Sequence, residues 1–262
     1  MAQADVPFFG SFGGFSVYKM RGTDKTVIRR SGGPSDEKMK TAPTLEPQRN
    51  QQTQLGGSST TARMIGDAMS SVKHLQDFPL HGHFVKLNSA ILKMDTTHPF
   101  GKQSIIFSRG LHLFEGLSLN RKTLFDSVVT TSIGFSISRE EHKAVVQLPE
   151  LAPGLNFNNP WKQPFYRFRV NLGIVRDMVY VKGNGYEPLT ADLNDQTIGF
   201  DTEWVSVKIP RAGQEIVLQL DNPSFDEHCH LLLSIGIEFG AQTNGPIEHV
   251  KYAGCAKVLT MK

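Results

Sequence analysis

The chain has 262 residues, of which 39% are hydrophobic and 20% charged, and this is the balance of an ordinary globular protein. Its two cysteines, Cys229 and Cys255, are too few for a disulfide scaffold and lack the CxxC spacing of zinc and redox sites. No apolar run approaches the ~20 residues of a membrane-spanning helix, and residues 1–9 lack the features of a secretory signal. We therefore expect cytoplasmic synthesis without a signal peptide and no membrane span.

The net charge of +3 is concentrated in the N-terminal block of residues 1–57. That block holds eight lysines and arginines against five acidic residues, which leaves twenty of each for the rest of the chain. A basic excess of this kind suits an acidic partner surface or a phosphate backbone. Lysine and arginine also protect solvated strand edges, so the excess alone does not choose between these explanations.

Four phenylalanines stand near the N-terminus and are interleaved with glycines, so a flexible backbone carries side chains that are costly to leave in water. They are Phe8, Phe9, Phe12 and Phe15. We expect this segment to fold back onto its own body or to insert into a neighbouring molecule.

Two stretches of strand composition follow, at residues 16–20 and 26–30, and the residues between them have turn chemistry. The pattern predicts a β-hairpin, which needs a partner because an isolated hairpin is marginal in water. Residues 36–57 continue as a polar run that contains Pro43 and Pro47, and this predicts an extended strap. Residues 1–57 are thus expected to form an arm.

The next segment, residues 58–127, is expected to be helical. Residues 58–75 carry apolar side chains at helical spacing after a serine suited to the N-cap, and Pro79 ends the pattern. Residues 82–94 form a second apolar stripe, and residues 120–129 add a short helical turn. The short link between the two longer helices favours an antiparallel helix pair.

From residue 128 onward, apolar and polar residues alternate as in strands, and turn signals separate eight expected strands. They span residues 133–138, 143–148, 165–175, 178–182, 203–209, 215–220, 230–239 and 255–261. The sequence therefore predicts an α+β chain, in which an N-terminal β-hairpin arm and an antiparallel helix pair precede an antiparallel β-sandwich over residues 128–262.

Several runs resemble a family of uncharacterised hypothetical proteins that is common in Bacteroidota genomes. They are GGFSVYK, VIRRSGGPS, TAPTLEPQRN, LGGSS, MDTTHPFGK and LLLSIGIEF. The similarity extends along most of the chain, and the N-terminal block is its most specific part. The resemblance fits the predicted architecture and implies no activity, cofactor or catalytic residue.

His228 and His230 form an HxH pair at the start of an expected strand, where residues two apart share a face and can present two metal ligands. Leucine, isoleucine and phenylalanine occupy the opposite face, so we expect both histidines on the less buried side. We interpret the pair as structural or solvent-facing, because the sequence supplies no third and fourth ligand.

Other motifs are weaker. Residues 161–169 combine aromatic and basic side chains, which suits a surface for single-stranded nucleic acid or sugars, but a half-buried strand gives the same string. Ser70 and Lys73 have the S-x-x-K spacing without its companion motifs. No P-loop, dinucleotide-binding, nucleophile-elbow or zinc-protease motif occurs, so we expect no enzyme and no cofactor.

The leading hypothesis is a structural subunit that polymerises into a filament, tube or ring, because its arm adds strands to a neighbouring copy. The phenylalanines would anchor the arm, and the arginines would fix its register. The interface residues are Phe8, Phe9, Phe12, Phe15, Val17, Tyr18, Val27, Ile28, Arg29 and Arg30. One alternative is a monomeric sandwich that binds a glycan or nucleic acid, and another is a metal-dependent enzyme that uses His228 and His230.

Overall fold

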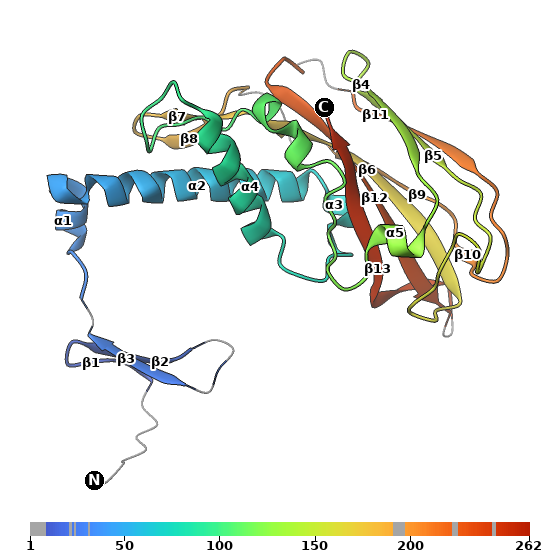
Figure 1. The fold of residues 1–262 in the computed structure, drawn as a ribbon, viewed down its shortest axis with the longest axis horizontal. Coiled ribbons are helices and arrows are strands. Elements are labelled where there is room, and N and C mark those ends of the chain that lie inside the picture. Colours follow the sequence, from blue (N-terminus) through green and yellow to red (C-terminus); the bar gives the residue numbers. More distant parts are fainter. Residues whose placement is uncertain are drawn as a thin grey trace, which may run out of the picture. The chain divides into compact units, whose positions relative to one another are not determined.

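The computed structural model describes residues 9–20, 23, 25–30, 32–190, 197–221, 225–242 and 245–262. The chain forms two compact units, Met1–Arg49 and Asn50–Lys262 (Figure 1). In the described residues, the N-terminal unit contains three strands, two short helices and the first residues of a long helix, and the second unit contains the remaining sheets and most of the helical residues. The predicted order of elements, a hairpin followed by helices and antiparallel sheets, is confirmed.

The N-terminal unit contains a three-stranded antiparallel sheet, which we call the N-terminal sheet. Its strands are β1 (Gly10–Phe12), β2 (Phe15–Lys19) and β3 (Thr26–Arg30). Strands β2 and β3 form the predicted hairpin, in which Val17 lies opposite Ile28. Strand β1 was not predicted, and it pairs with β2 because Gly13 and Gly14 adopt the positive φ angles of a tight hairpin turn, +58° and +81°.

The prediction of an extended strap over residues 36–57 is wrong, because this region is helical. It forms α1 (Asp36–Thr41), the 3-10 helix η1 (Pro43–Leu45) and the start of α2 (Glu46–Asp67). Pro43 and Pro47 stand in the first turns of their helices, where the missing N–H would have no intrahelical acceptor. Gly57 lies inside α2 because the ring of Tyr186 occupies the space of a side chain there.

The helix predicted over residues 58–75 is divided in two. Helix α2 ends at Asp67, and α3 (Ser70–Lys73) follows. Asn171 occupies the break, since its Nδ2 donates to the carbonyl oxygen of Ala68 at 2.7 Å and its Oδ1 accepts from the N–H of Ser71 at 3.3 Å. Gly173 lets this turn approach the sheet, because a Cβ there would lie 2.1 Å from the Ala68 oxygen.

Helix α4 (His81–Met94) agrees with the predicted second helix and crosses α2 (Figure 1). Asn88 of α4 donates from Nδ2 to the carbonyl oxygen of Ser58 in α2 at 2.9 Å. The remaining helices are short, namely η2 (Phe107–Arg109), η3 (Leu111–Leu113) and α5 (Phe125–Val128). None of the helices in the described ranges is both long and apolar enough to span a bilayer.

Two antiparallel sheets form the sandwich. The large sheet consists of β6 (Phe165–Arg176), β9 (Thr197–Asp201), β10 (Val205–Ser206), β12 (Cys229–Ala241) and β13 (Glu248–Met261). The small sheet consists of β4 (Gly134–Ser138), β5 (Lys143–Leu148) and β11 (Gln214–Gln219). A separate hairpin consists of β7 (Met178–Val181) and β8 (Gly185–Pro188). Strands β8 and β9 were not predicted, and the strand predicted over 203–209 shrinks to β10.

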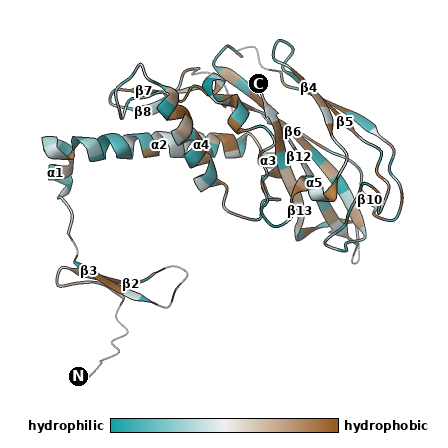
Figure 2. Cartoon of the chain, viewed as in Figure 1, coloured by the Kyte–Doolittle hydropathy of each residue, from teal (hydrophilic) through white to brown (hydrophobic). Residues whose placement is uncertain are grey.

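The large sheet lies between two apolar clusters. One cluster fills the space between the two sheets and includes Phe168 and Ile235, and the other packs the opposite face of the large sheet against the helices and includes Ile65 and Leu232. The central strands are accordingly mostly hydrophobic, whereas the start of α2 is hydrophilic (Figure 2). The second unit therefore has three layers and a core of its own.

We expected the side of the strand that carries His228 and His230 to be the less buried one. This expectation is wrong for most of β12. On the side we expected to be solvated, His230, Leu232, Ser234 and Glu238 are all fully buried. The helices pack on this side of β12. The alternation of apolar and polar residues in the sequence does not show that a second layer packs there.

Candidate functional site

The N-terminal sheet carries its apolar side chains on one face. Paired residues of an antiparallel sheet point to the same side, and alternate residues of a strand point to opposite sides. The register places Phe12 beside Phe15, and Val17 beside Ile28. We call these four side chains the apolar face.

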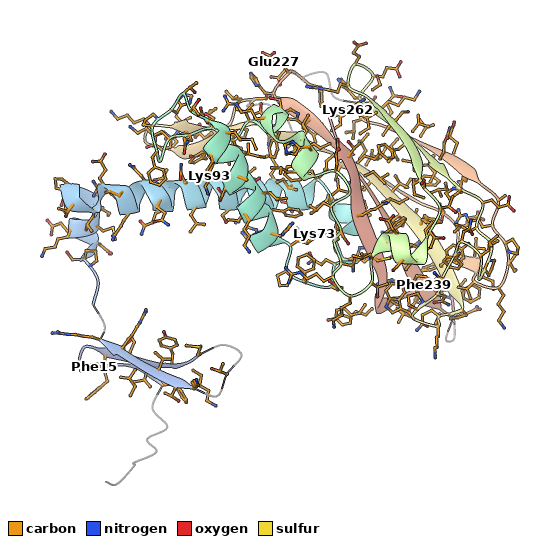
Figure 3. All side chains as sticks on the ribbon, viewed as in Figure 1. Phe15, Lys73, Lys93, Glu227, Phe239 and Lys262 are labelled. Atoms are coloured by element: carbon orange, nitrogen blue, oxygen red, sulfur yellow. The ribbon has the colours of Figure 1, made fainter. Side chains whose placement is uncertain are left out.

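The apolar face is exposed. Phe12 is 78% exposed, Phe15 49% and Ile28 68%, and Phe15 projects from the sheet in Figure 3. None of the described residues of the N-terminal unit is buried. Exposed neighbouring apolar side chains of this size are typical of interaction sites.

The opposite face of the N-terminal sheet is more polar. It presents Ser11, Ser16, Tyr18, Val27 and Arg29, with 2.9 Å between the two serine hydroxyls and the Arg29 guanidinium 5.6 Å from the Tyr18 ring centre. The predicted interface residues are thus divided between two faces.

The other predicted interface residues lie around the apolar face. Arg30 lies opposite Phe15, at the end of β3. Phe9 precedes β1 and is 53% exposed, and Phe8 lies outside the described residues.

The second unit has an open edge at β4. In the described part of the chain, β4 pairs only with β5. Phe135 of β4 lies opposite the buried Val146 and therefore faces the inside of the sandwich, yet it is 43% exposed. It borders a hollow of about 290 Å³ whose lining combines the apolar Ile133 and Leu259 with polar side chains such as those of Asp126 and Lys257. A half-exposed aromatic ring and an unpaired strand edge therefore lie side by side here.

A buried carboxylate, Glu238, ties the helical layer to the large sheet. The Arg167 Nε contacts its Oε1, and the Nε of Arg169 lies 3.0 Å from its Oε2. His74, which follows α3, lies 2.9 Å from the same Oε2, and His249 of β13 lies 3.5 Å from it. We call these five residues the Glu238 cluster.

The pKa values of the Glu238 cluster follow from burial and charge. Burial alone would raise the pKa of the carboxyl group, but the contacts with His74, Arg167 and Arg169 lower it to about 2. Burial lowers the pKa of the His249 imidazole, and the carboxylate of Glu238 offsets only part of that effect. The carboxylate is therefore ionised at neutral pH.

The Glu238 cluster has some features of a metal site. His74, Glu238 and His249 are the one group in the described residues whose ligand atoms lie close enough together to hold a metal ion. However, two guanidinium groups already neutralise the carboxylate, and they would repel a cation in this buried setting. We interpret the cluster as an ion-pair lock between layers.

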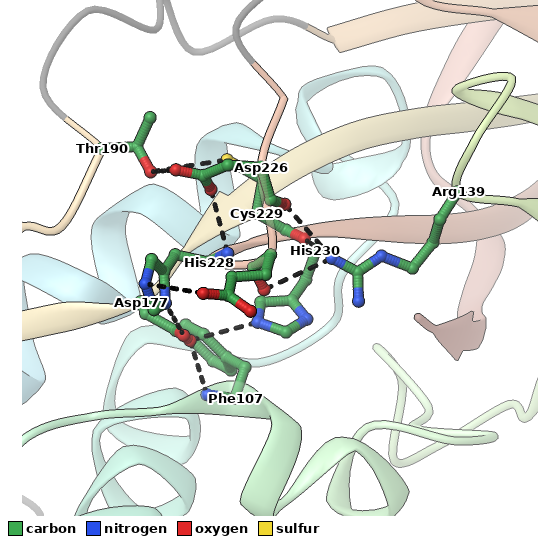
Figure 4. Close-up of polar contacts among 9 residues, drawn as sticks. Phe107, Arg139, Asp177, Thr190, Asp226, His228, Cys229 and His230 are labelled. Carbon is green, nitrogen blue, oxygen red and sulfur yellow. Dashed lines mark hydrogen bonds and ion pairs between the residues drawn. The ribbon is translucent and has the colours of Figure 1, made fainter.

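The predicted HxH pair meets a third residue, Asp177 (Figure 4). Its Oδ1 accepts the N–H of Phe107 at 2.7 Å and lies 3.1 Å from His230 Nε2, while its Oδ2 lies 3.3 Å from His228 Nδ1. Asp177 is itself buried. The pair therefore shares a structural carboxylate, and this contact supports the interpretation that the histidines are structural.

The segment beside this pair contains a buried cysteine, Cys229. Cys229 is fully buried, and burial raises the pKa of its thiol, so the reactive thiolate is suppressed. The Arg139 guanidinium contacts the carbonyl oxygens of Asp226, Glu227 and Cys229, at 2.8 to 3.3 Å (Figure 4). These bonds fix the start of β12.

Residues 161–169 combine buried and exposed side chains, and neither Ser70 nor Lys73 is buried. Tyr166 and Phe168 are fully buried in the sandwich, so they do not offer their rings to a nucleic acid. Lys73 forms an ion pair with Asp67 at 3.3 Å, and Ser70 is exposed.

Sequence reasoning missed the Glu238 cluster because its members lie as far apart as residues 74 and 249. One signal was present, since a glutamate inside the apolar run LLLSIGIEF must find partners when that run is buried. The partners themselves depend on the tertiary structure.

Comparison with known proteins adds no further constraint on these sites. The resemblance to a Bacteroidota family stays an expectation, and we infer function from the contacts and exposures of these sites. No protein-family model, curated protein or solved structure matches the chain.

Proposed function

We propose that this protein is a structural subunit that assembles with copies of itself through the N-terminal sheet. The observation that carries the proposal is the exposed apolar face, formed by Phe12, Phe15, Val17 and Ile28. The second unit has its own hydrophobic core, one part between its two sheets and the other between the large sheet and the helices. The described core includes no residue of the N-terminal sheet, so the second unit does not need that sheet to bury its apolar side chains.

Burial of the apolar face supplies the driving force. Removing a large apolar side chain from water contributes about 1.5–3 kcal/mol. A lone sheet of three short strands does not gain this free energy, whereas a sheet packed on a neighbour does. The partner we propose is a second copy, because that copy carries a matching acceptor.

The acceptor is the β4 edge of the second copy. A strand added there would extend the small sheet by β-augmentation and cover the half-exposed Phe135. The apolar face would then continue the inner layer of the sandwich, next to Ile133 and Leu259. Such a contact joins two different surfaces, so repetition gives a filament, a tube or a ring.

The test compares substitutions on the two faces of the N-terminal sheet. One variant carries Phe12→Ser with Ile28→Thr on the apolar face, and the matched control carries Tyr18→Ser with Val27→Thr on the opposite face. We expect light scattering and negative-stain microscopy to show assemblies for the control and the unaltered chain, and monomers for the first variant. A chain that stays monomeric at high concentration would overturn the proposal.

The acceptor is tested separately. Phe135→Lys places a charge beside the β4 edge without touching the N-terminal sheet, and we expect it to abolish assembly. Mixing this variant with the apolar-face variant should give dimers at most, because each retains one of the two surfaces. Continued polymer formation by Phe135→Lys would rule out the β4 edge as the acceptor.

A further inference from the structure

A second hollow, of about 470 Å³, lies on the second unit and shares no lining residue with the hollow beside the β4 edge. Three loops and β13 enclose it, and the lining combines aromatic and polar side chains. The residues are Gln76, Asp77, Asn120, Lys122, Thr123, Trp161, Tyr252 and Gly254. Its size is that of a small-molecule site.

An irregularity of β13 places an aromatic ring at the hollow. Glu238 of β12 pairs with Gly254, and Gly240 pairs with His249, so β13 has extra residues between these pairs. Tyr252 lies in this bulge with φ of +66° and is 75% exposed. A non-glycine residue in this conformation costs free energy, and such strain concentrates at functional sites.

A second aromatic ring comes from the loop before β6. The Trp161 indole lies 5.0 Å from the ring of the buried Phe239, and this contact fixes its position. Trp161 also lines the hollow, so Trp161 and Tyr252 together supply aromatic surface from two distant segments.

The polar groups of the hollow differ in their hydrogen bonding. The Asp77 carboxylate accepts the N–H groups of Arg121 and Lys122 at 2.8 to 3.0 Å, and both amide atoms of Asn120 are bonded to the backbone. By contrast, Lys122 is exposed and Thr123 is half-buried, so their side chains can meet a ligand in the hollow. Gln76 Oε1 has no hydrogen-bond partner in the described structure, but it is shielded from solvent and is not open to the hollow.

We propose that this hollow binds a carbohydrate of one or two sugar rings. Aromatic faces stack on the apolar side of a sugar ring, and the side chains of Lys122 and Thr123 would hydrogen-bond its hydroxyl groups. The lining holds one carboxylate and one ammonium group, Asp77 and Lys122, and a further ammonium group, that of Lys251, lies 5.0 Å from the Tyr252 ring centre. A nucleotide phosphate is therefore the competing ligand, and the test includes AMP. The lining shares no residue with the hollow beside the β4 edge, so the proposal does not depend on the assembly.

The test titrates the full chain with lactose, cellobiose, maltose, N,N′-diacetylchitobiose and AMP up to about 10 mM. Trp204→Phe leaves Trp161 as the single tryptophan, so its fluorescence reports on this hollow. We expect at least one sugar to change the fluorescence and to show saturation-transfer NMR signals. The absence of both signals for all four sugars would overturn the proposal.

Two variants locate the binding. Tyr252→Asn removes the ring and retains a residue that tolerates positive φ, and we expect it to weaken binding roughly tenfold. Phe100→Ser removes another exposed ring, 55% exposed, and should leave binding unchanged. Binding that survives Tyr252→Asn, or a preference for AMP over every sugar, contradicts the proposal.

Discussion

The N-terminal sheet and strand β12 are both β-structure, but they have opposite environments. No described residue of the N-terminal sheet is buried, whereas in β12 every residue but Ala241 is buried. Strand β12 has a neighbour on each side and a packed layer on each face. The difference shows that strand formation is a local property, while burial depends on the layers that the rest of the chain supplies.

The largest effect is expected at the one charged side chain of β12. Glu238→Ala leaves two guanidinium groups without their buried partner and should lower the free energy of unfolding by about 3–5 kcal/mol. Asp201→Asn, at the more exposed end of the same network, should cost less than about 1 kcal/mol. Denaturant unfolding measures both, and equal losses would refute the lock between layers.

A matched pair of isoleucines tests the comparison directly. Ile235→Ala in β12 should cost about 2–5 kcal/mol, because this side chain is fully buried. Ile28→Ala in the N-terminal sheet should change the unfolding of the second unit by less than about 0.5 kcal/mol. A loss above about 1 kcal/mol for Ile28→Ala under monomeric conditions would show that this side chain supports the second unit.

The folded state is expected to lose stability in acid. The pKa of Glu238 is lowered to about 2, so its ionised form stabilises the folded state above pH ~4.5, and this stability is lost as the pH falls towards 2. The lowered pKa of His249 acts in the same direction below pH ~6.5, because the unfolded chain binds the proton more readily.

Thermal unfolding between pH 7 and pH 3 checks this acid dependence. The melting temperature should fall continuously in the unaltered chain, and His249→Gln should remove the part near pH 6. Constant stability down to pH 3 would contradict both pKa shifts.

Effects smaller than that of Glu238→Ala are expected at two adjacent glycines of α2. Gly57→Ala would place a Cβ 2.4 Å from the Tyr186 ring, so it should cost about 1–3 kcal/mol. At Gly56 a Cβ meets no atom within 4 Å, so Gly56→Ala should add about 0.5–1 kcal/mol through helix propensity. If both substitutions raise the melting temperature, a Cβ at residue 57 is tolerated beside the Tyr186 ring, and the expected clash is wrong.

Local patterns predicted much of this fold. The hairpin of β2 and β3, helix α4 and most strands of the sandwich follow from periodicity and turn residues. The helical character of residues 36–57 did not, because Pro43 and Pro47 were interpreted as breaks when they begin helices. The capping serine, Ser35, was a usable signal, since its side chain accepts the N–H of Lys38.

The sites were less predictable than the elements. The sequence pointed to the N-terminal block, but the division of its side chains between two faces depends on the register. The Gly13–Gly14 turn places Phe12 opposite Phe15, and the pairing of β2 with β3 places Ile28 opposite Val17 and Val27 opposite Tyr18. The partners of His228 and Glu238 come from other strands and helices, so no local pattern contains them.

The burial of both cysteines has a practical consequence. Cys229 and Cys255 are fully enclosed, and burial raises the pKa of both thiols, so the folded chain resists alkylating dyes. A single cysteine introduced on the opposite face of the N-terminal sheet, as in Tyr18→Cys, would therefore take up a fluorophore selectively and leave the apolar face unaltered. Energy transfer between donor- and acceptor-labelled copies would then report on the proposed assembly.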